Sequence, residues 1–316
     1  IGGGSSELKA NYEILPLEGI QNEFKNANIL YSVGYTSKNE TYEIKQKLKK
    51  DAIIIAEQAD VVLFIGGLNK NLFQDCENAD RKYYNLPYNQ DELIESISKI
   101  NKNTAVILIS GNAVDLPWRY RVKSILQSWY LGSESGNALA SILSGKVNPS
   151  GKLPFSFPKK LSENAAHFYG ELSYPGNGET QYYKEDILVG YRWHDTKKIK
   201  PEFAFGHGLS YASFQFSEII LDKKTYNLND TIKISCNLSN VGKINGSEVV
   251  QVYIGKENSM VERALKELKG FKKVLVQKAS TKKVEISIPV SDLAYYDETI
   301  SDWNIENALN QISNKD

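Results

Sequence analysis

Hydrophobic and polar positions follow two different periods along the 316-residue chain. In its first half, continuous apolar runs alternate with segments whose apolar residues have helical spacing. The apolar runs 60–67, 104–110 and 124–130 are typical of strands buried on both faces. Helices are expected at 40–59, 90–100 and 134–145. This repeated order predicts an open parallel sheet with right-handed crossovers, an α/β sandwich over residues 1–157.

From about residue 217 the period becomes two. The segment 231–240 (TIKISCNLSN) places every second side chain on one face, and 248–255 and 282–290 follow the same rule. Short alternating strands separated by turn residues predict an all-β sandwich of the immunoglobulin type over 217–303. Between the two patterns, residues 158–216 combine glycine, proline and many aromatics, which predicts an extended segment wrapped onto the protein rather than a free linker.

One loop between a strand and a helix concentrates ionisable side chains. The stretch FQDCENADRKYYNLPYNQ, residues 73–90, carries Asp75, Glu77, Asp80 and Arg81 directly after a buried strand. In open parallel sheets the loops at the carboxyl ends of strands form the ligand sites. The loop therefore has two interpretations, a solvated surface loop or a catalytic acid presented to a partner domain.

Composition excludes several other functions. Lysine plus arginine number 38, as do aspartate plus glutamate, which argues against nucleic acid or an anionic membrane as partner. No apolar run approaches the ~20 residues that span a bilayer. The two cysteines and three histidines lack metal-binding spacing, so neither a metal nor a cofactor is expected. The chain begins with Ile1 and shows no signal-peptide pattern, so we expect it to be part of a longer protein.

Many short motifs, in order, resemble the carboxyl-terminal part of glycoside hydrolase family 3 enzymes of the β-glucosidase type. The resemblance covers about residues 1–303. The motifs are GGGSS (2–6), PLEGI (16–20), FIGGLN (64–69), CENADR (76–81), LPYNQDELI (86–94), GNALASILSGKVNPSGKLPFSFP (136–158), VGYRWHD (189–195), FGHGLSYASF (205–214), GSEVVQVYIG (246–255) and KELKGFKKV (266–274).

The resemblance implies an enzyme built from three parts. An N-terminal TIM-like barrel carries the aspartate nucleophile, an α/β sandwich supplies the acid/base glutamate, and a fibronectin type III-like domain braces the assembly. This chain resembles the second and third parts and lacks the barrel. After Trp303 the last strand of the fibronectin-like domain is replaced by residues with no strand pattern, so 304–316 are expected to be a tail.

The same resemblance assigns roles on the loop. In the family's E-x-E-G-x-D-R segment the second glutamate is the acid/base, and that position is Glu77 here, with Asp75 as the fallback. Asn78 replaces the family's glycine. Asp80 and Arg81 are expected to bind substrate or to order the loop. The ordering role is favoured, because a cation beside Glu77 would lower the pKa of an acid that must hold its proton. Arg81 is therefore expected to pair with Asp80 or another acid.

Two further expectations concern Trp193 and the titration of Glu77. Trp193 is the tryptophan predicted to stack on a sugar or to order a loop. The negative charge of the nucleophile should keep the acid protonated. Without the barrel, Glu77 is therefore expected to titrate near the ordinary ~4.3 and to be ionised at neutral pH.

The resulting hypothesis is the acid/base-bearing portion of a retaining, exo-acting β-glucosidase that removes terminal β-D-glucosyl residues. Its partners would be a β-glucoside or short β-linked oligosaccharide and the TIM-like barrel, and the chain alone would be inactive. A periplasmic or secreted bacterial location follows from the resemblance. The alternatives are a β-xylosidase on the same scaffold, a non-catalytic carbohydrate-binding or assembly module and, from the sheet pattern alone, a nucleotide-binding protein.

Overall fold

The chain forms two compact units, Ile1–Val147 and Asn148–Asp316. The structure is a computed structural model that describes residues 5, 7–77, 79–306 and the backbone of 310–314. Residues 2–4 and 6 of the GGGSS motif, and Asn78, lie outside the described residues.

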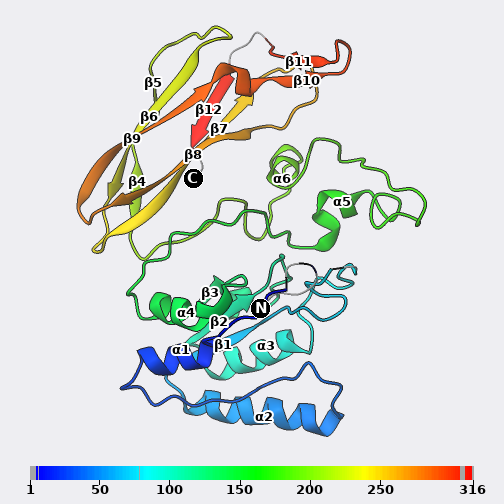
Figure 1. The fold of residues 1–316 in the computed structure, drawn as a ribbon, viewed down its shortest axis with the longest axis vertical. Coiled ribbons are helices and arrows are strands. Elements are labelled where there is room, and N and C mark those ends of the chain that lie inside the picture. The colour runs from blue at the N-terminus through cyan, green and yellow to red at the C-terminus, as the bar shows by residue number, and fades with distance from the viewer. Residues whose placement is uncertain (1–4, 6, 78, 307–309, 315–316) are drawn as a thin grey trace. The chain divides into compact units, whose positions relative to one another are not determined.

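The first unit alternates helices and strands in the predicted order (Figure 1). Its elements are α1 (Pro16–Glu23), α2 (Tyr42–Gln58), β1 (Val62–Gly67), α3 (Gln90–Ile100), β2 (Thr104–Ile109), η2 (Arg119–Arg121), β3 (Ser124–Gln127), η3 (Gly132–Glu134) and α4 (Ser135–Leu143). The strands form one parallel sheet of order β1-β2-β3. The α/β fold class is therefore confirmed for this part of the chain.

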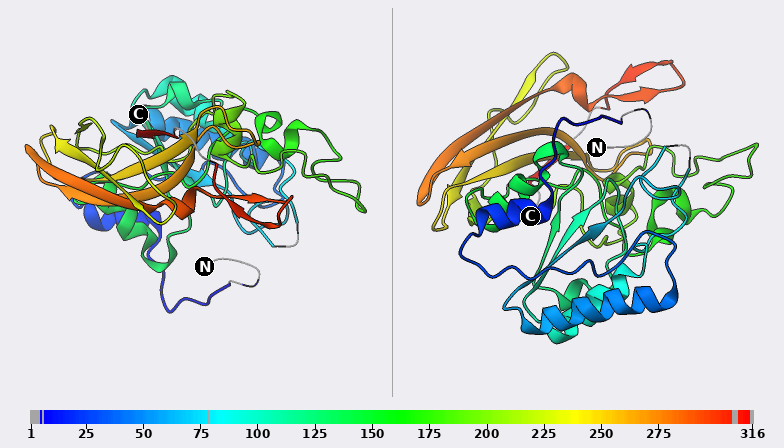
Figure 2. Two further views of the ribbon diagram at one scale, coloured as in Figure 1. Left: turned by 90° about the horizontal axis from the view of Figure 1, so that it is seen from above. Right: turned by 60° about the horizontal axis from the view of Figure 1, so that its bottom comes forward.

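Helices cover both faces of this sheet (Figures 1 and 2). Because side chains alternate along a strand, Ile107 points to one face and packs with Ile20 of α1 and Leu139 of α4. Gly66 and Phe64 share the opposite face, where the side chain of Gln90 from α3 fills the space above Gly66. Burial on both sides explains why the strands read as continuous apolar runs.

Helices α1 and α4 approach each other so closely that only glycine fits at their contact. A Cβ added to Gly19 would lie 2.1 Å from the carbonyl carbon of Gly136, and one added to Gly136 would lie 2.2 Å from the carbonyl oxygen of Leu15. Backbone atoms form both obstacles, so no side-chain rotation can relieve the overlap. The motifs that contain these glycines, 16–20 and 136–158, therefore specify a helix crossing.

The first unit ends at Val147 instead of continuing to residue 157 as expected. The side-chain hydrogen bonds of Asn148 agree with this boundary, because their partners come later in the chain. Its Nδ2 donates to the carbonyl of Asn245 at 3.0 Å, and its Oδ1 accepts from the hydroxyl of Ser210 at 2.9 Å and the backbone N–H of Tyr211 at 2.8 Å. Residues 148–216 thus belong to the second unit, where they contain η4 (Leu161–Glu163), α5 (Ala165–Phe168) and α6 (Tyr191–Thr196).

The rest of the second unit is built from antiparallel strands. They are β4 (Phe214–Phe216), β5 (Ile220–Leu221), β6 (Thr231–Asn240), β7 (Gly246–Lys256), β8 (Glu267–Val276), β9 (Ser280–Pro289), β10 (Tyr295–Asp297), β11 (Asp302–Asn304) and β12 (Asn310–Asn314), with η5 (Val290–Leu293) after β9. One sheet joins β4, β5 and β9 to β6, another has the order β12-β7-β8, and β10 pairs with β11. This arrangement confirms the predicted all-β part.

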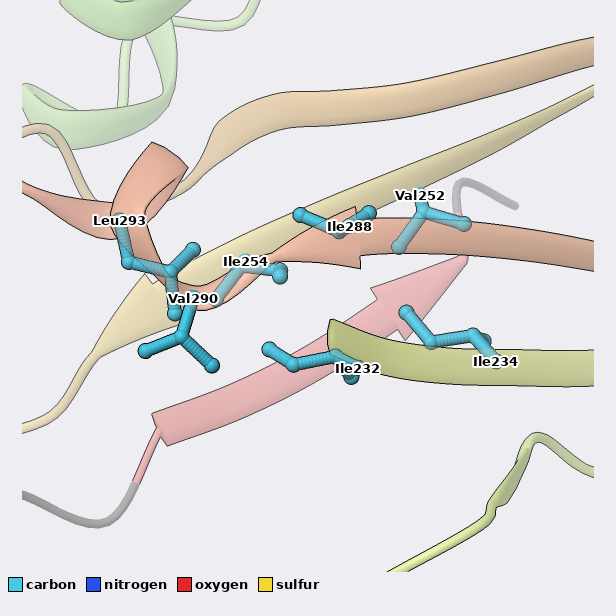
Figure 3. Packing of buried hydrophobic residues seen from close by; sticks show 7 residues of the cluster. All are labelled: Ile232, Ile234, Val252, Ile254, Ile288, Val290 and Leu293. Carbon is cyan, nitrogen blue, oxygen red and sulfur yellow. The ribbon is translucent and has the colours of Figure 1, made fainter. Parts of the chain in front are cut away.

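The inward-facing residues of the two larger sheets form a shared core (Figure 3). Ile232 and Ile234 of β6 pack with Val252 and Ile254 of β7 and with Ile288 of β9. The burial of β6 alternates residue by residue, which is the period of two seen in the sequence. The hydrophobic alternation therefore identifies the buried face of β6. In β7, by contrast, five consecutive residues from Val250 to Ile254 are buried, so the expected alternation does not hold there.

The expectation that 304–316 form a tail without strand structure was wrong for residues 310–314. These form β12, which pairs antiparallel with β7, so that Ile312 lies opposite Ile254. Glu306, before this strand, accepts hydrogen bonds from the Ser259 hydroxyl at 2.7 Å and the Met260 N–H at 2.8 Å. Strand pairing uses backbone groups, which every residue except proline supplies, so a polar segment can close a sheet edge without a hydrophobic pattern.

Candidate active site

The loop that carries the predicted acid starts at a fixed point, the end of β1. The amide of Gln90, which is fully buried, bonds both backbone groups of Gly67: its Oε1 accepts from the Gly67 N–H and its Nε2 donates to the Gly67 carbonyl, each at 2.8 Å. A Cβ at Gly66 would lie 2.2 Å from that Oε1. Glycine at 66 therefore makes room for the side chain that ties the start of α3 to the start of the loop.

A tyrosine hydroxyl holds the first part of the loop. The Tyr88 hydroxyl accepts hydrogen bonds from the side-chain amides of Asn71, at 3.0 Å, and Gln74. Tyr88 and Asn89 both have positive φ, 62° and 57°. The left-handed backbone conformation of these two residues turns the chain into α3 and places the Tyr88 ring beside the loop. The segment before Asp75 is therefore hydrogen-bonded to the segment that closes the loop.

A half-buried carboxyl group, that of Asp91, fastens the far end of the loop. Asp91 accepts from the Leu86 N–H at 3.0 Å and from the Trp118 indole N–H at 2.7 Å. Burial raises the pKa of Asp91 to about 6, against the lowering effect of these two bonds, and nearby Asp115 and Glu95 raise it further.

The raised pKa of Asp91 predicts a loss of stability with rising pH. Folded Asp91 holds its proton to about pH 6, whereas the unfolded chain loses it near the ordinary ~3.9. Between these values the folded state binds more protons than the unfolded state. The contribution of Asp91 to the free energy of unfolding therefore falls as pH rises from 4 to 6 and is constant above pH 6. Allowing for partial solvent screening, we expect a loss of about 1–2 kcal/mol.

Urea unfolding at pH 4.5 and 7 tests this prediction by comparing the parent chain with Asp91→Asn. The asparagine variant cannot ionise, so its stability should change less over this range than that of the parent. Asp51→Asn, at an exposed position on α2, is the matched control and should keep the parent's dependence. An equal pH dependence in all three proteins would contradict the assignment.

The carboxylate of Asp75 is surrounded by hydrogen-bond donors. Oδ2 accepts from the Gly111 N–H at 2.6 Å and the Tyr130 hydroxyl at 2.7 Å, and Oδ1 accepts from the Asn112 amide at 3.0 Å. Burial and the bond to Asp75 raise the pKa of Tyr130. An acceptor engaged by three donors from two other segments is suited to fixing the loop rather than to exchanging protons.

Glu77, two residues later, is exposed and differently placed. Its carboxylate accepts from the backbone N–H of Ser5, and the Ser5 hydroxyl donates to Oε1 at 2.7 Å. These bonds lower the pKa of Glu77 below its ordinary value, so the group is ionised at pH 7. The expectation of an ordinary pKa thus missed the downward shift, because it considered the absent nucleophile but not the N-terminal segment.

Arg81 bonds the segment that follows β2. Its Nη2 donates to the carbonyl of Ala113 at 2.6 Å, and burial lowers its pKa while the nearby charge of Asp75 opposes that shift. Asp80 is exposed and makes no ion pair with Arg81 within the described part of the chain. The acid close to Arg81 is therefore Asp75, and this arrangement favours a loop-ordering role for the arginine.

Trp193 lies in the second unit, where its burial supports the second of its two expected roles, loop ordering, over sugar stacking. Its side chain is 1% exposed and packs with Ala165, Leu188 and Ala264. The indole N–H donates to the carbonyl of Glu163 at 3.0 Å. A buried ring offers no face to a ligand, and the bond to η4 fits the loop-ordering alternative. Aromatic content alone could not choose between the two roles, because it does not distinguish core from surface.

Sequence reasoning missed the four residues that donate hydrogen bonds to the carboxylates of Asp75 and Glu77: Ser5, Gly111, Asn112 and Tyr130. Gly111 and Asn112 follow β2, and Tyr130 follows β3, so both segments lie at the same edge of the sheet as the loop after β1. The rule that carboxyl ends of parallel strands meet at one edge was a usable signal for these three. Ser5 lies in the GGGSS motif, but nothing in that motif pointed to a contact with Glu77.

Two features are absent from the described residues, a cluster of metal ligands and a membrane-spanning helix. Across the described residues, no three histidine, cysteine, aspartate or glutamate side chains gather closely enough to hold a metal ion. None of the helices in that part of the chain combines the length and apolar character needed to cross a membrane.

Comparison with known proteins identifies close relatives. The chain is 48% identical over 314 residues to β-glucosidase BoGH3A of Bacteroides ovatus, a match that covers 97% of this chain and 42% of the relative. It is 40% identical over 310 residues to thermostable β-glucosidase B of Acetivibrio thermocellus, covering 96% of this chain and 40% of that protein. The chain therefore spans less than half the length of these curated relatives.

Solved structures agree with the fold. DesR, a β-glucosidase from Streptomyces venezuelae in complex with D-glucose, matches with a TM-score of 0.81 and 33% identity, covering 87% of this chain and 34% of that one. A family 3 β-glucosidase from Bifidobacterium adolescentis matches with a TM-score of 0.87 and 29% identity, over 98% of this chain and 46% of that one.

Family models divide the chain in the order that the motifs indicated. The glycosyl hydrolase family 3 C-terminal domain matches residues 1–211, and the fibronectin type III-like domain matches residues 248–312. The parallel α/β sheet and the antiparallel sandwich are the folds found in these respective parts of the chain. The chain therefore belongs to glycosyl hydrolase family 3, of which it contains the C-terminal domain followed by a fibronectin type III-like domain.

Proposed function

We propose that this chain is the C-terminal part of a retaining, exo-acting β-glucosidase and that Glu77 supplies its general acid/base. A TIM-like barrel in another part of the protein supplies the aspartate nucleophile. The observation that carries the proposal is the contrast between two neighbouring carboxylates. Asp75 is engaged by three donors, whereas Glu77 is exposed and accepts bonds only from Ser5 among the described residues.

The proposed reaction has two steps with balanced protons. In the first, the Glu77 carboxylic acid gives its proton to the glycosidic oxygen, the aglycone leaves as an alcohol, and the aspartate forms a glucosyl ester. In the second, the Glu77 carboxylate takes a proton from water, which attacks the anomeric carbon and releases β-glucose and the aspartate. The two carboxyl groups must lie about 5–5.5 Å apart, which requires the acid to stand on an exposed loop.

The titration of Glu77 supports a division of labour between the parts. Ser5 lowers the pKa of Glu77, so the chain by itself holds the carboxylate form, which is wrong for the first step. A neighbouring aspartate anion on the barrel raises the pKa, because two close carboxylates resist double ionisation. The chain alone is therefore inactive as a hydrolase.

The substrate class follows from the relatives. Those compared above are all named β-glucosidases, and one structure holds D-glucose, which favours β-glucosides over β-xylosides for this chain. In the proposed site this chain supplies the acid, Glu77, whereas the barrel would supply most contacts to the glucosyl ring.

The proposal is tested by joining this chain to the part of BoGH3A that it does not match, as one polypeptide. We expect the joined protein to release p-nitrophenol from p-nitrophenyl β-glucoside, faster than from the β-xyloside. The chain alone should release none. The matched control is the same BoGH3A part without this chain.

Two results would contradict the proposal. Hydrolysis by the chain alone would place the nucleophile within these residues. Binding of glucose or cellobiose by the chain alone, together with an inactive but folded joined protein, would favour a carbohydrate-binding module.

A further inference from the structure

We infer that Tyr130 is a positioning residue for the acid/base, acting through Asp75. This inference rests on the proposed role of Glu77. It concerns the cluster formed by Asp75, Gly111, Asn112 and Tyr130, which we call the Asp75 clamp.

The Asp75 clamp joins all three strand ends of the sheet. Asp75 belongs to the loop after β1, Gly111 and Asn112 follow β2, and Tyr130 follows β3. The Tyr130 hydroxyl and the Gly111 N–H converge on the same oxygen of Asp75, at 2.7 and 2.6 Å. The loop is therefore tied to the two segments that directly follow the neighbouring strands β2 and β3.

Glycine at 111 is part of the arrangement. A Cβ added there would lie 3.3 Å from Cε2 of Tyr130 and 3.4 Å from Oδ2 of Asp75. The first distance is tight, so a methyl group would shift the ring by a few tenths of an ångström, whereas the second is an ordinary contact. The absence of a side chain thus lets the backbone N–H of Gly111 and the Tyr130 hydroxyl reach one oxygen together.

The short distance along the chain transmits this restraint to the acid. Glu77 follows Asp75 by two residues, and two residues of extended chain span at most ~7 Å. On the other side of Glu77, Arg81 bonds the Ala113 carbonyl at 2.6 Å, in the same segment after β2. Glu77 therefore lies between two residues, Asp75 and Arg81, that are both hydrogen-bonded to the segment after β2. The only direct contacts of its carboxylate that the structure describes are with Ser5.

Positioning matters because proton transfer requires close geometry. A misplacement of 1 Å at a reacting group costs about 10²-fold in rate. A leaving group that departs readily without a proton is insensitive to the acid's position, whereas a poor leaving group depends on it. A defect in the Asp75 clamp should therefore slow the hydrolysis of substrates with poor leaving groups much more than that of substrates with good ones.

The test uses the joined protein with Tyr130→Phe, which removes one hydroxyl and keeps the ring. With methyl β-glucoside, a poor leaving group, we expect kcat to fall about 10-fold, less than the 10²-fold of a full misplacement. With 2,4-dinitrophenyl β-glucoside we expect the rate of the first step, in which the glucosyl ester forms, to change less than 2-fold. Tyr120→Phe, at a tyrosine that is 82% exposed, is the matched control and should change neither rate.

A double-mutant cycle with Asp75→Asn separates positioning from general damage. Because the tyrosine acts through Asp75, adding Tyr130→Phe to Asp75→Asn should cause little further loss. Additive losses, or an equal rise in KM for both substrates, would overturn the inference and indicate a direct contact with substrate.

Failure of this inference is distinguishable from failure of the proposed function. If Glu77→Ala shows the leaving-group dependence and Tyr130→Phe does not, only the positioning role falls. If Glu77→Ala lacks that dependence and Asp75→Asn shows it, Asp75 is the acid/base and both assignments are overturned.

Discussion

Replacing Glu77 with alanine in the joined protein is expected to lower kcat for methyl β-glucoside by about 10³-fold, within the range that general acid–base catalysis supplies. The physical reason is that the departing alkoxide is strongly basic and requires a proton as the bond breaks. With 2,4-dinitrophenyl β-glucoside the first step needs no proton, so the glucosyl ester should still form and then accumulate. Steady-state rates with the two substrates, and a burst of dinitrophenolate, measure this difference.

Azide gives an independent readout of the same variant. It attacks the glucosyl ester without a base, so it should restore turnover of Glu77→Ala with the activated substrate and yield β-glucosyl azide. The parent enzyme, which has its base, should gain little. Glu57→Ala, on the exposed side of α2, is the matched control and should behave as the parent. Equal losses on both substrates without azide rescue would remove Glu77 from the acid/base role.

Replacing Gly136 with alanine is expected to destabilise the first unit by about 3 kcal/mol, at the upper end of the usual cost of overpacking. Helix propensity alone predicts the opposite sign, because alanine favours a helix interior over glycine by about 1 kcal/mol. The added Cβ, however, would lie 2.2 Å from the Leu15 carbonyl oxygen, so α1 must move away from α4. That movement opens the core around Ile107.

Chemical unfolding followed by circular dichroism measures the effect. Gly151→Ala is the matched control, because a Cβ there meets nothing within 4 Å and its backbone needs no positive φ. We expect that variant to be as stable as the parent or slightly more stable. A Gly136→Ala protein with unchanged or raised stability would show that the helix crossing relaxes at little cost.

Much of the fold could be predicted from local patterns. The helix over 90–100 and the strand over 104–109 were predicted almost to their ends, because burial of one helix face or of both strand faces imposes a period on the residues themselves. The placement of the loop after β1 followed from the same reasoning. Glu77 came from a motif, and its exposure on that loop agrees with the expectation that it faces another part of the protein.

The tertiary structure decided how the side chains around the loop are used. Asp75 and Tyr130 are 55 positions apart, and Glu77 and Ser5 are 72 apart, so no periodicity relates them. The structure also placed Trp193 in a core and paired residues 310–314 with β7.

One physical reason separates what the sequence determined from what the tertiary structure decided. The sequence by itself determined which residues are buried and which loop follows a strand end, because hydrophobic burial repeats with the local backbone geometry. Hydrogen bonds between side chains and pairing at a sheet edge depend on which backbone segments approach through space. Only the folded chain decided that Asp75 fixes the loop while Glu77 remains exposed.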